Sequence, residues 1–578
     1  MERASTFIEY IEQSIIQNWD LNALTDYKGI TLQYKDVARK IAKFHLVLES
    51  AGIRPGDKIA VCGRNSAHWG VTFLATVTYG AVIVPILHEF KADNIHHIVN
   101  HSEAKLLFVG ARAWEALDES VMPHLEGIVL LEDFTPVVCR NEALMEAFEH
   151  RNARYGARYP RNFRPEHIHY RRETSPDELA VINYTSGTTG YSKGVMLPYR
   201  SLWSNVDYCR EMLRVEPGDR IVSMLPLGHV FGMVYDFLYG FAAGAHLYFL
   251  TRMPSPKIIA QSFAEIRPKV IACVPLIVEK IIKKSILPRV DNTIGKLLLR
   301  VPIVNDKIKA AARKEAMEIF GGQFDEIIIG GAPFNADVER FVKQIGFPYT
   351  IAYGMTECGP IICSNRWETL KLASCGRAAA RMEVRIDSPD PEHVAGEIIC
   401  RGTNTMLGYY KNPEATAQII DVNGWLHTGD LGTMDADGYV TVRGRSKNML
   451  LTAAGQNIYP EEIESKLNNM PYVSESLIVL QNEKLVALIY PDFDEAFAKG
   501  LRQEDIAAVM EANRVELNQQ LPAYSQIAKV KIHYEEFEKT AKKSIKRFMY
   551  QEAKGQSEEI CMPPAIRTGL SPVRTHPD

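Results

Sequence analysis

The stretch Tyr184-Thr-Ser-Gly-Thr-Thr-Gly-Tyr-Ser-Lys-Gly-Val-Met-Leu197 follows a short apolar run and combines three glycines with several hydroxyl side chains and Lys193. Glycine lets the backbone approach an anion closely and take positive φ. Turned backbone N–H groups form an anion-binding concavity, and hydroxyl groups add donors. Lys193 adds a mobile positive charge. The stretch therefore predicts a loop that binds phosphate, with a flexible surface loop as the competing interpretation.

This loop differs from the common P-loop, GxxxxGK[ST], in which lysine directly follows the last glycine and a helix begins. Two residues separate Gly190 from Lys193 here, and the apolar residues 195–197 predict that a strand follows. The predicted frame of the loop is therefore strand, loop, strand.

Around this loop, short apolar runs ending at Gly or Pro breaks alternate with longer amphipathic segments such as 34–51. The runs that we interpret as buried strands are 58–63, 105–110, 179–184, 220–225, 270–274 and 326–330. Strands that alternate with helices favour an α/β architecture with mostly parallel sheets.

The pattern changes after about Gly376, where predicted strands come close together at 383–386, 396–401, 431–434 and 439–443. Asp437-Gly438 between the last two predicts a hairpin. A calcium loop is the weaker alternative there, because the other ligands of a twelve-residue loop are missing. We expect a small β-rich subdomain in this region.

A further compositional unit begins near residue 446, with a helix predicted from Pro460 and the acidic residues after it. The chain turns polar and Pro-rich beyond about residue 555. We therefore predict an N-terminal domain over 1–445, a small α+β domain over 446–554, and a loose tail over 555–578.

Composition narrows the class of protein. The chain has 578 residues, of which 46% are hydrophobic and 24% charged, and a net charge of -4. It is too long for a single core, and this charge gives no case for nucleic acid as a partner. The nine cysteines form no CxxC pair, which suits a reducing compartment. Without a signal-peptide pattern or a long apolar run, we expect a cytoplasmic protein without a transmembrane segment, with peripheral membrane contact left open.

The stretch 184–197 resembles the signature of the adenylate-forming superfamily, which includes acyl-CoA synthetases, firefly luciferase and the adenylation domains of peptide synthetases. Ser192 stands where the family often has proline. The resemblance implies that ATP phosphates lie in this loop, with Lys193 as a catalytic cation and Thr185 near magnesium. The phosphate-binding residues would be Thr185, Ser186, Gly187, Thr188, Thr189 and Gly190.

Two further motifs follow in the family's order. Residues 225–232, Leu-Pro-Leu-Gly-His-Val-Phe-Gly, resemble a segment that lines the acyl pocket, which implies that His229 positions the substrate. A satisfied structural histidine is the alternative. Residues 330–334 resemble a turn against the adenine, which would place Gly331, Ala332 and Pro333 there, with an ordinary turn as the alternative.

The motif Tyr353-Gly354-Met355-Thr356-Glu357 is more specific. The resemblance implies that Tyr353 stacks on adenine, that Thr356 contacts phosphate and that Glu357 holds Mg²⁺. A hard cation on phosphate oxygens does prefer a carboxylate ligand. The alternative is a solvated glutamate after a turn.

The remaining motifs lie near the predicted domain junction. By resemblance, Asp430 and Arg445 bind the ribose, Lys447 is the hinge residue, and Gly455 lies near the pantetheine channel. A carboxylate suits a diol as an acceptor. Without the family, Lys447 is a charged surface residue.

The segment 537–547 departs from the pattern of the family that the other motifs resemble. Family members usually carry a catalytic lysine there, and alignment on Thr540 and Ile545 places Ser544 at its position. Lys543 is one residue away and is our candidate catalytic lysine. The alternative is a basic, solvated stretch, and Lys193 would then be the one positive side chain placed near the phosphates.

The implied reaction joins a carboxylic acid to ATP as an acyl-adenylate with release of pyrophosphate, and then transfers the acyl group to coenzyme A. The protein must orient the reactants and stabilise charge, and a small domain rotates between the steps. The segments 80–85 and 402–416 look most like fatty acyl-CoA synthetases, so we favour a medium- or long-chain fatty acid over an aryl acid. Two alternatives are transfer to an acyl carrier protein in trans and a catalytically weakened nucleotide- or acyl-binding protein.

Overall fold

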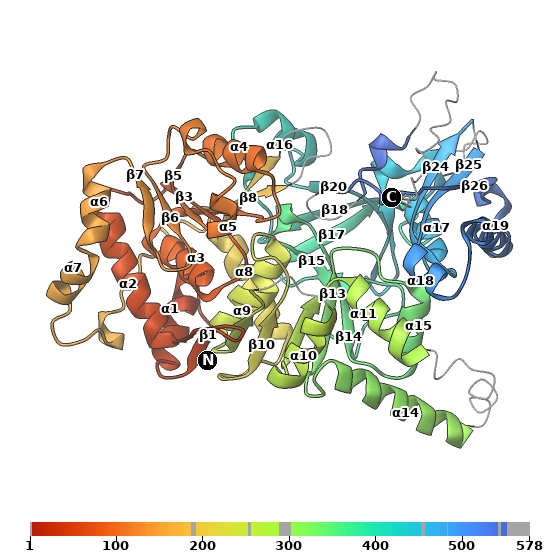
Figure 1. Cartoon of the computed structure of the whole chain (residues 1–578), viewed down its shortest axis with the longest axis horizontal. Helices are drawn as coiled ribbons and strands as arrows, with labels where there is room; N and C mark the ends of the chain where they lie inside the picture. The colour runs from red at the N-terminus through yellow and green to blue at the C-terminus, as the bar shows by residue number, and fades with distance from the viewer. Residues whose placement is uncertain are drawn as a thin grey trace, which may run out of the picture.

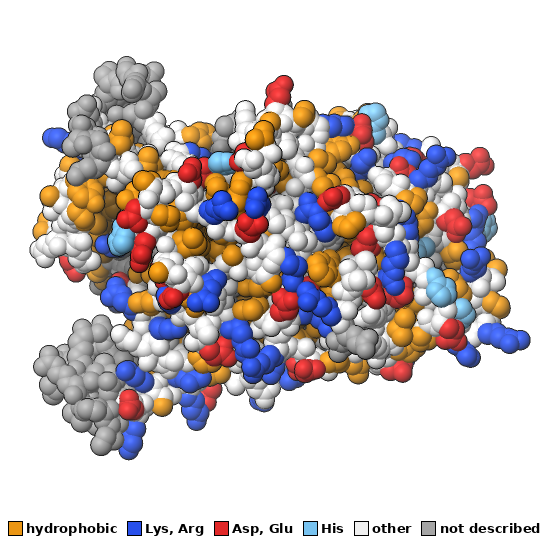
Figure 2. Space-filling view, turned by 180° about the vertical axis from the view of Figure 1, so that it is seen from behind, with side chains coloured by type: hydrophobic (Ala, Val, Ile, Leu, Met, Phe, Trp, Pro, Cys, Tyr) orange, Lys and Arg blue, Asp and Glu red, His pale blue; other side chains and the backbone are white. Residues whose placement is uncertain are grey.

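The computed structural model describes residues 3–185, 192–251, 256–287, 302–451, 457–482, 484–540 and 545–551. The elements that follow the predicted junction near residue 446 are blue in Figure 1 and form a lobe at one end of the elongated molecule. Both signs of charge are interspersed over the face seen in Figure 2, and the described side chains visible there gather into no large area of one sign.

The first large sheet has the strand order β19-β9-β8-β4-β3-β5-β6-β7 within the described residues. Its centre is parallel, and the edge pairs β6–β7, β8–β9 and β9–β19 are antiparallel. The strands are β3 (Lys58–Cys62), β4 (Val82–Ile86), β5 (Ala104–Val109), β6 (Gly127–Leu130), β7 (Pro136–Cys139), β8 (Leu179–Thr185), β9 (Lys193–Pro198) and β19 (Gly408–Tyr409).

The second large sheet has the order β16-β15-β14-β13-β12-β10-β11-β1-β2, again with a parallel centre and antiparallel edges. Its strands are β1 (Asn22–Asp26), β2 (Thr31–Gln33), β10 (Arg220–Ser223), β11 (His246–Phe249), β12 (Val270–Cys273), β13 (Glu326–Gly330), β14 (Tyr349–Gly354), β15 (Ile361–Ser364) and β16 (Arg377–Ala378). The α/β architecture predicted from the alternating strands and helices is confirmed, with strand ends shifted by a residue or two.

One continuous hydrophobic core contains side chains from both sheets and from helices α2 (Tyr34–Ser50), α3 (Ala67–Tyr79) and α8 (Tyr199–Met212). A helix that is apolar on all sides must be buried, and α3 is buried along nearly its whole length. A Cβ at Gly70 on α3 would lie 3.1 Å from Phe237 and 3.3 Å from Leu24, so glycine permits this close approach.

Further helices cover the two sheets (Figure 1). They are α1 (Phe7–Gln17), α4 (Ala92–Ser102), α5 (Ala111–Trp114), α6 (Glu142–Glu149), α7 (Arg151–Arg158), α9 (Tyr239–Ala242), α10 (Pro256–Ile266), α11 (Pro275–Ile281), α14 (Pro302–Ile319), α15 (Ala336–Gln344) and α16 (Pro413–Ile419). No described helix is both long and apolar enough to cross a membrane.

The predicted β-rich subdomain is an antiparallel sheet of β17 (Met382–Asp387), β18 (Gly396–Gly402), β20 (Leu426–Met434) and β21 (Val440–Arg445). The hairpin predicted at Asp437-Gly438 joins β20 and β21, and Gly438 has φ +83. Asp435 and Asp437 both pair with Lys371 at 2.6 Å. These carboxylates therefore hold a lysine, which supports the hairpin over the calcium loop.

The C-terminal lobe has its own core beneath the three-stranded sheet β24-β25-β26. Its elements are β22 (Leu450–Leu451), β23 (Asn457–Ile458), α17 (Pro460–Leu467), β24 (Val473–Gln481), β25 (Lys484–Pro491), α18 (Phe493–Ala498), α19 (Gln503–Gln519) and β26 (Lys529–Ile532). Asn469 of this lobe accepts hydrogen bonds from Asn335 and Lys283 of the larger part. The exact domain boundaries stay a prediction.

A buried carboxylate fixes the segment that contains His229. Asp236 lies in the π-helix η3 (Gly232–Leu238), and its Oδ2 accepts the N–H groups of Met224 and Leu225 at 2.9 Å each. Burial raises the pKa of Asp236 well above its ordinary value, although the two N–H groups oppose this shift. The carboxyl ties the end of β10 to η3, and the loop between them carries His229.

We expect Asp236→Ala to lower the free energy of unfolding by about 2–6 kcal/mol, because two buried N–H groups would lose their acceptor at about 1–3 kcal/mol each. The change is measured as the urea midpoint of the circular dichroism signal. Asp306→Ala, on the exposed side of α14, should stay within about 0.5 kcal/mol of the parent chain. Equal effects of the two variants would contradict the role of Asp236.

Candidate active site

The predicted phosphate loop connects two antiparallel strands. β8 ends at Thr185 and β9 begins at Lys193, and these two residues face each other in the ladder. The strand predicted after the loop is confirmed. Ser186, Gly187, Thr188, Thr189 and Gly190 lie outside the described residues.

Tyr409, which the sequence motifs did not identify, contacts both Lys193 and Glu357. The Lys193 Nζ lies 4.9 Å from the centroid of the Tyr409 ring, and the Tyr409 hydroxyl donates to Glu357 Oε1 at 2.8 Å. Burial, and then Glu357, raise the pKa of Tyr409 far above its ordinary value, so this hydroxyl stays a donor. Tyr409 is on β19, which pairs with β9 beside Lys193. The sequence gives little indication of this role, because an uncharged Gly-Tyr-Tyr run is also typical of residues in a hydrophobic core.

The segment 353–357 connects β14 to the short helix η5 (Thr356–Cys358), where Thr356 and Glu357 are buried. The Glu357 carbonyl accepts the N–H of Met406 at 2.8 Å, which holds this turn against the chain that leads into β19. Gly354 is exposed, and Met355 is half-buried. The motif is therefore fixed on one side by the strand and on the other by residues 406–409.

The turn at Gly331, Ala332 and Pro333 is exposed at the carboxyl end of β13, and Gly331 has φ +87. β13 and β14 are parallel neighbours, with Gly330 opposite Ala352. Carboxyl ends of parallel strands share one edge of a sheet, where open α/β folds bind ligands. The turn and Tyr353 are thus brought to the same edge.

Asp430 lies at a junction of three elements. Its Oδ2 accepts the Tyr353 hydroxyl at 2.7 Å, and its Oδ1 lies 2.7 Å from Arg445 Nε. Burial raises the pKa of Asp430, and Arg445 opposes this shift. A carboxylate has about four lone-pair sites, so it can accept further hydrogen bonds beside these two. The structure brings Tyr353, Asp430 and Arg445 together.

His229 is half-buried in the loop before η3. Its Nδ1 accepts the N–H of Phe231 at 3.2 Å, so Nε2 carries the proton in the neutral ring. Asn183 on β8 donates to the carbonyl of Gly228 at 2.9 Å. This bond connects the histidine loop to the strand that leads into the phosphate loop.

The predicted hinge residue, Lys447, lies two residues after Arg445. Lys447 lies in the short helix η6 (Ser446–Asn448), and its pKa is lowered by desolvation and then by Arg445, while Asp430 acts in the opposite direction. Gly455 lies outside the described residues.

Lys543, with Ser544 beside it, also lies outside the described residues. The lysines on either side of that gap form ion pairs. Lys539 lies 2.7 Å from Glu475, and Lys546 lies 2.8 Å from Glu538.

The geometry gathers a lysine, two buried carboxylates, a partly buried tyrosine ring and an arginine where the first sheet, the second sheet and the small antiparallel sheet meet. Such a set can hold a nucleotide by its base, ribose and phosphates, and the histidine loop adjoins it. Residues 11–410 match the AMP-binding enzyme family, and residues 447–554 match the AMP-binding enzyme C-terminal domain. The chain belongs to the AMP-binding enzyme family.

Two characterised relatives are acyl-CoA ligases. A methyl-dioxo-octahydroindenyl-propanoyl:CoA ligase of Rhodococcus jostii strain RHA1 is 30% identical over 487 residues, which are 83% of this chain and 86% of that protein. A long-chain-fatty-acid–CoA ligase of Mus musculus is 26% identical over 491 residues, which are 79% of this chain and 66% of the mouse protein. The family and these relatives make the chain an AMP-forming acyl-CoA ligase.

Solved structures support the fold. ATP-bound MatB of Rhodopseudomonas palustris superposes with a TM-score of 0.72 at 23% identity, over 93% of this chain and 98% of that chain. The anthranilate CoA ligase AuaEII, in complex with anthranoyl-AMP, has a TM-score of 0.73 at 19% identity, over 95% of this chain and 97% of that chain.

We expect Tyr409→Phe to lower kcat/KM for ATP by about tenfold to a hundredfold, because the buried Glu357 loses a hydrogen bond of about 1.5–3 kcal/mol while the ring beneath Lys193 remains. The measurement is the initial rate of AMP release at several Mg²⁺ concentrations. Tyr410→Phe is the matched control, because its hydroxyl contacts the exposed Glu103 at 3.2 Å. Equal losses in both variants would show that the Tyr409 hydroxyl has no special role.

Proposed function

We propose that this chain activates a carboxylic acid with a large apolar acyl group, in the size range of a medium- or long-chain fatty acid, and transfers it to coenzyme A with release of AMP and pyrophosphate. The observation that carries the proposal is the contact of Lys193 with Tyr409 and of Tyr409 with Glu357, beside the bonded set of Tyr353, Asp430 and Arg445. A cation and a carboxylate held together beside a glycine-rich loop suit the phosphates of ATP.

In the first step the acid's carboxylate attacks the α-phosphorus, an acyl-adenylate forms and pyrophosphate leaves. Glu357 and Thr185 would hold Mg²⁺, which neutralises phosphate charge when bound. Lys193 and Thr356 would stabilise charge on the phosphates. Asp430 and Arg445 would hold the ribose, and His229 would position the acid.

In the second step the thiol of coenzyme A attacks the acyl carbonyl and AMP leaves. We infer that Lys447 is the hinge for this step. It lies two residues beyond the end of β21, and the bond between Asn448 and Glu461 (2.6 Å) lies just beyond it. A hinge is a few residues at the end of an element that absorb a large change in φ and ψ.

Two observations support the proposed size of the acyl group: apolar side chains near the histidine loop and the names of two relatives. η3 places Tyr235 beside Phe231 of the histidine loop, with the two ring centroids 5.3 Å apart. The mouse relative is a long-chain-fatty-acid–CoA ligase. The Rhodococcus relative acts on a ring-containing acid, which favours a bulky ring acid as the second candidate substrate.

The activity is tested by AMP release with ATP, Mg²⁺ and a panel of straight-chain, ring-containing and aryl acids, with and without coenzyme A. We expect coenzyme-dependent AMP release that is fastest with medium- or long-chain acids. Adenylate formation without transfer to coenzyme A would favour a carrier protein as acceptor, and no turnover with any acid would favour a binding protein.

The missing family lysine gives a separate prediction. We expect Lys193→Ala and Lys543→Ala each to slow adenylate formation about 100-fold or more, because each removes a charge that stabilises the transition state. Thioester formation from supplied acyl-adenylate should fall much less. The two half-reactions are measured by pyrophosphate release and acyl-CoA formation.

Lys546→Ala is the control for this experiment, because Lys546 pairs with the exposed Glu538 in the same segment as Lys543. Unchanged adenylate formation in both Lys193→Ala and Lys543→Ala would rule out a single essential lysine among these two.

A further inference from the structure

One face of the second sheet leads away from the nucleotide edge. Alternate residues of a strand point to the same side, so Glu326, Ile328 and Gly330 share one face of β13. The register pairs Ile328 with Thr350 and Gly330 with Ala352 on β14, which places those two on the same face. A Cβ at Gly330 would lie 3.0 Å from the Phe231 ring, so this face is the one that η3 covers.

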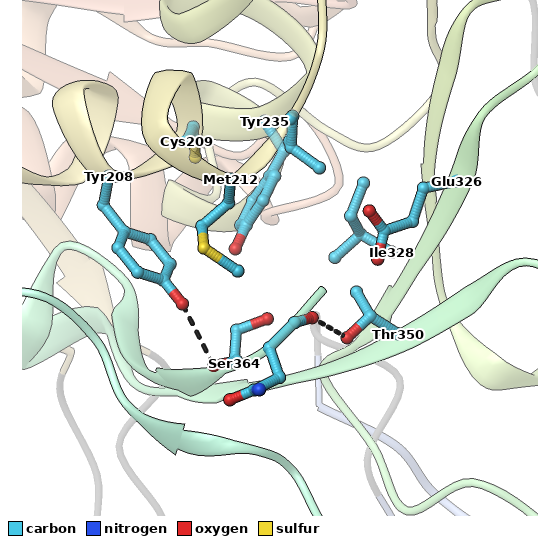
Figure 3. Close-up of a pocket in the computed structure, with 10 residues that line it drawn as sticks. Tyr208, Cys209, Met212, Tyr235, Glu326, Ile328, Thr350 and Ser364 are labelled. Carbon is cyan, nitrogen blue, oxygen red and sulfur yellow. Dashed lines mark hydrogen bonds between the residues drawn. The ribbon is translucent and has the colours of Figure 1, made fainter. Parts of the chain in front are cut away.

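The far end of this face is a small cavity whose walls are mostly apolar (Figure 3). It has about 10 Å³, room for about one water molecule. Its walls come from α8, η3, β13, β14 and β15, and Figure 3 shows Glu326 and the hydroxyl of Tyr235 directed toward it. The Tyr235 ring lies 5.3 Å from the Phe231 ring, and Phe231 is two residues from His229. The cavity therefore continues the histidine loop into the molecule.

Glu326 has a carboxyl oxygen that it can offer to a ligand in the cavity. The Tyr208 hydroxyl already donates to the carbonyl of Ser364 at 3.0 Å, and Thr350 donates to the carbonyl of Asn365. Glu326 Oε1 accepts the N–H of Trp367 at 2.8 Å, and no described residue bonds to its Oε2.

Glu326 is in the form that can donate. Its side chain is buried, and burial raises its pKa to about 8; Trp367 N–H and Arg366 oppose the shift, and Glu368 and Asp325 add to it. Burial also raises the pKa of Tyr208, Cys209 and Tyr235, so these groups stay protonated. At neutral pH the cavity presents a neutral carboxyl.

The distance of Glu326 from the nucleotide edge suits the end of an acyl group. Four residues of strand separate Glu326 from Gly330, about 13 Å. A second, open pocket of about 290 Å³ shares Met212, Leu213 and Glu326 with the cavity. Because methionine is a flexible filler of gaps, movement of Met212 would join the two spaces.

We propose that the acid activated by this enzyme carries an oxygen, such as a ketone or a hydroxyl group, at the end remote from its carboxylate, and that Glu326 donates a hydrogen bond to it. This inference rests on the proposed function. A plain methyl end would leave the O–H of the buried Glu326 without an acceptor from the substrate, which disfavours such an acid. Sites built to hydrogen-bond a substrate group reject analogues that lack it.

The test compares pairs of medium-chain acids of equal length, one plain and one with a ketone next to the last carbon, by kcat/KM for coenzyme-dependent AMP release. We expect the parent enzyme to prefer the ketone at least about tenfold. Glu326→Leu should reduce the preference to about one or reverse it, and Glu326→Gln should keep part of it because an amide can donate.

Two controls separate this role from a structural one. Glu339→Gln changes another buried carboxyl, which bonds to Tyr349 and Ala373 outside the cavity, and should leave the ratio of the two acids unchanged. In the parent enzyme the ratio should fall as pH rises through about 8, because ionised Glu326 cannot donate. This pH measurement uses the parent enzyme alone, so its result does not depend on whether a variant folds.

Equal use of the two acids by the parent enzyme, with a ratio that neither pH nor Glu326→Leu changes, would overturn the proposal while leaving the ligase activity intact. If neither kind of acid supports AMP release, the proposed function is overturned, and this inference is overturned with it.

Discussion

The burial of two carboxylates, Asp430 and Glu357, is the constraint on which the arrangement of this protein depends. A buried charge is costly unless it is paired and hydrogen-bonded. Asp430 meets that requirement with Tyr353 from the second sheet and Arg445 from β21, and Glu357 meets it with Tyr409 from the edge of the first sheet. The two carboxylates therefore hold together parts of the chain that no local preference would bring close. Each carboxylate keeps lone pairs that these contacts do not use.

The same contacts relate the reaction to the movement of the C-terminal lobe. Arg445 pairs with Asp430 at one end of β21, and the inferred hinge begins two residues later. In the proposed function, a ligand bound to Asp430 would lie next to Arg445, at the end of the strand that leads into the inferred hinge.

Much of the fold could be predicted because its signals are local. Short apolar runs marked the parallel strands, and Asp437-Gly438 marked the hairpin, since these patterns depend on neighbours in the sequence. Tyr409 could not be found in this way, because its role comes from pairing of β19 with β9 across about two hundred residues. Glu326 begins one of the strands predicted from the sequence, but nothing local shows that its carboxyl faces a cavity. The roles of Lys543 and Gly455 stay predictions, since both lie outside the described residues.

The position of β19 has a consequence for how the protein is made. β9, which carries Lys193, lies between β8 and a two-residue strand that is translated more than two hundred residues later. Until residue 409 has left the ribosome, the outer edge of β9 has unpaired N–H and C=O groups, and such edges pair readily with other chains. During much of its synthesis, a nascent chain in which β8 and β9 have paired therefore has an unpaired edge strand beside its predicted phosphate loop. The cell must keep that edge from meeting a second copy before Tyr409 arrives.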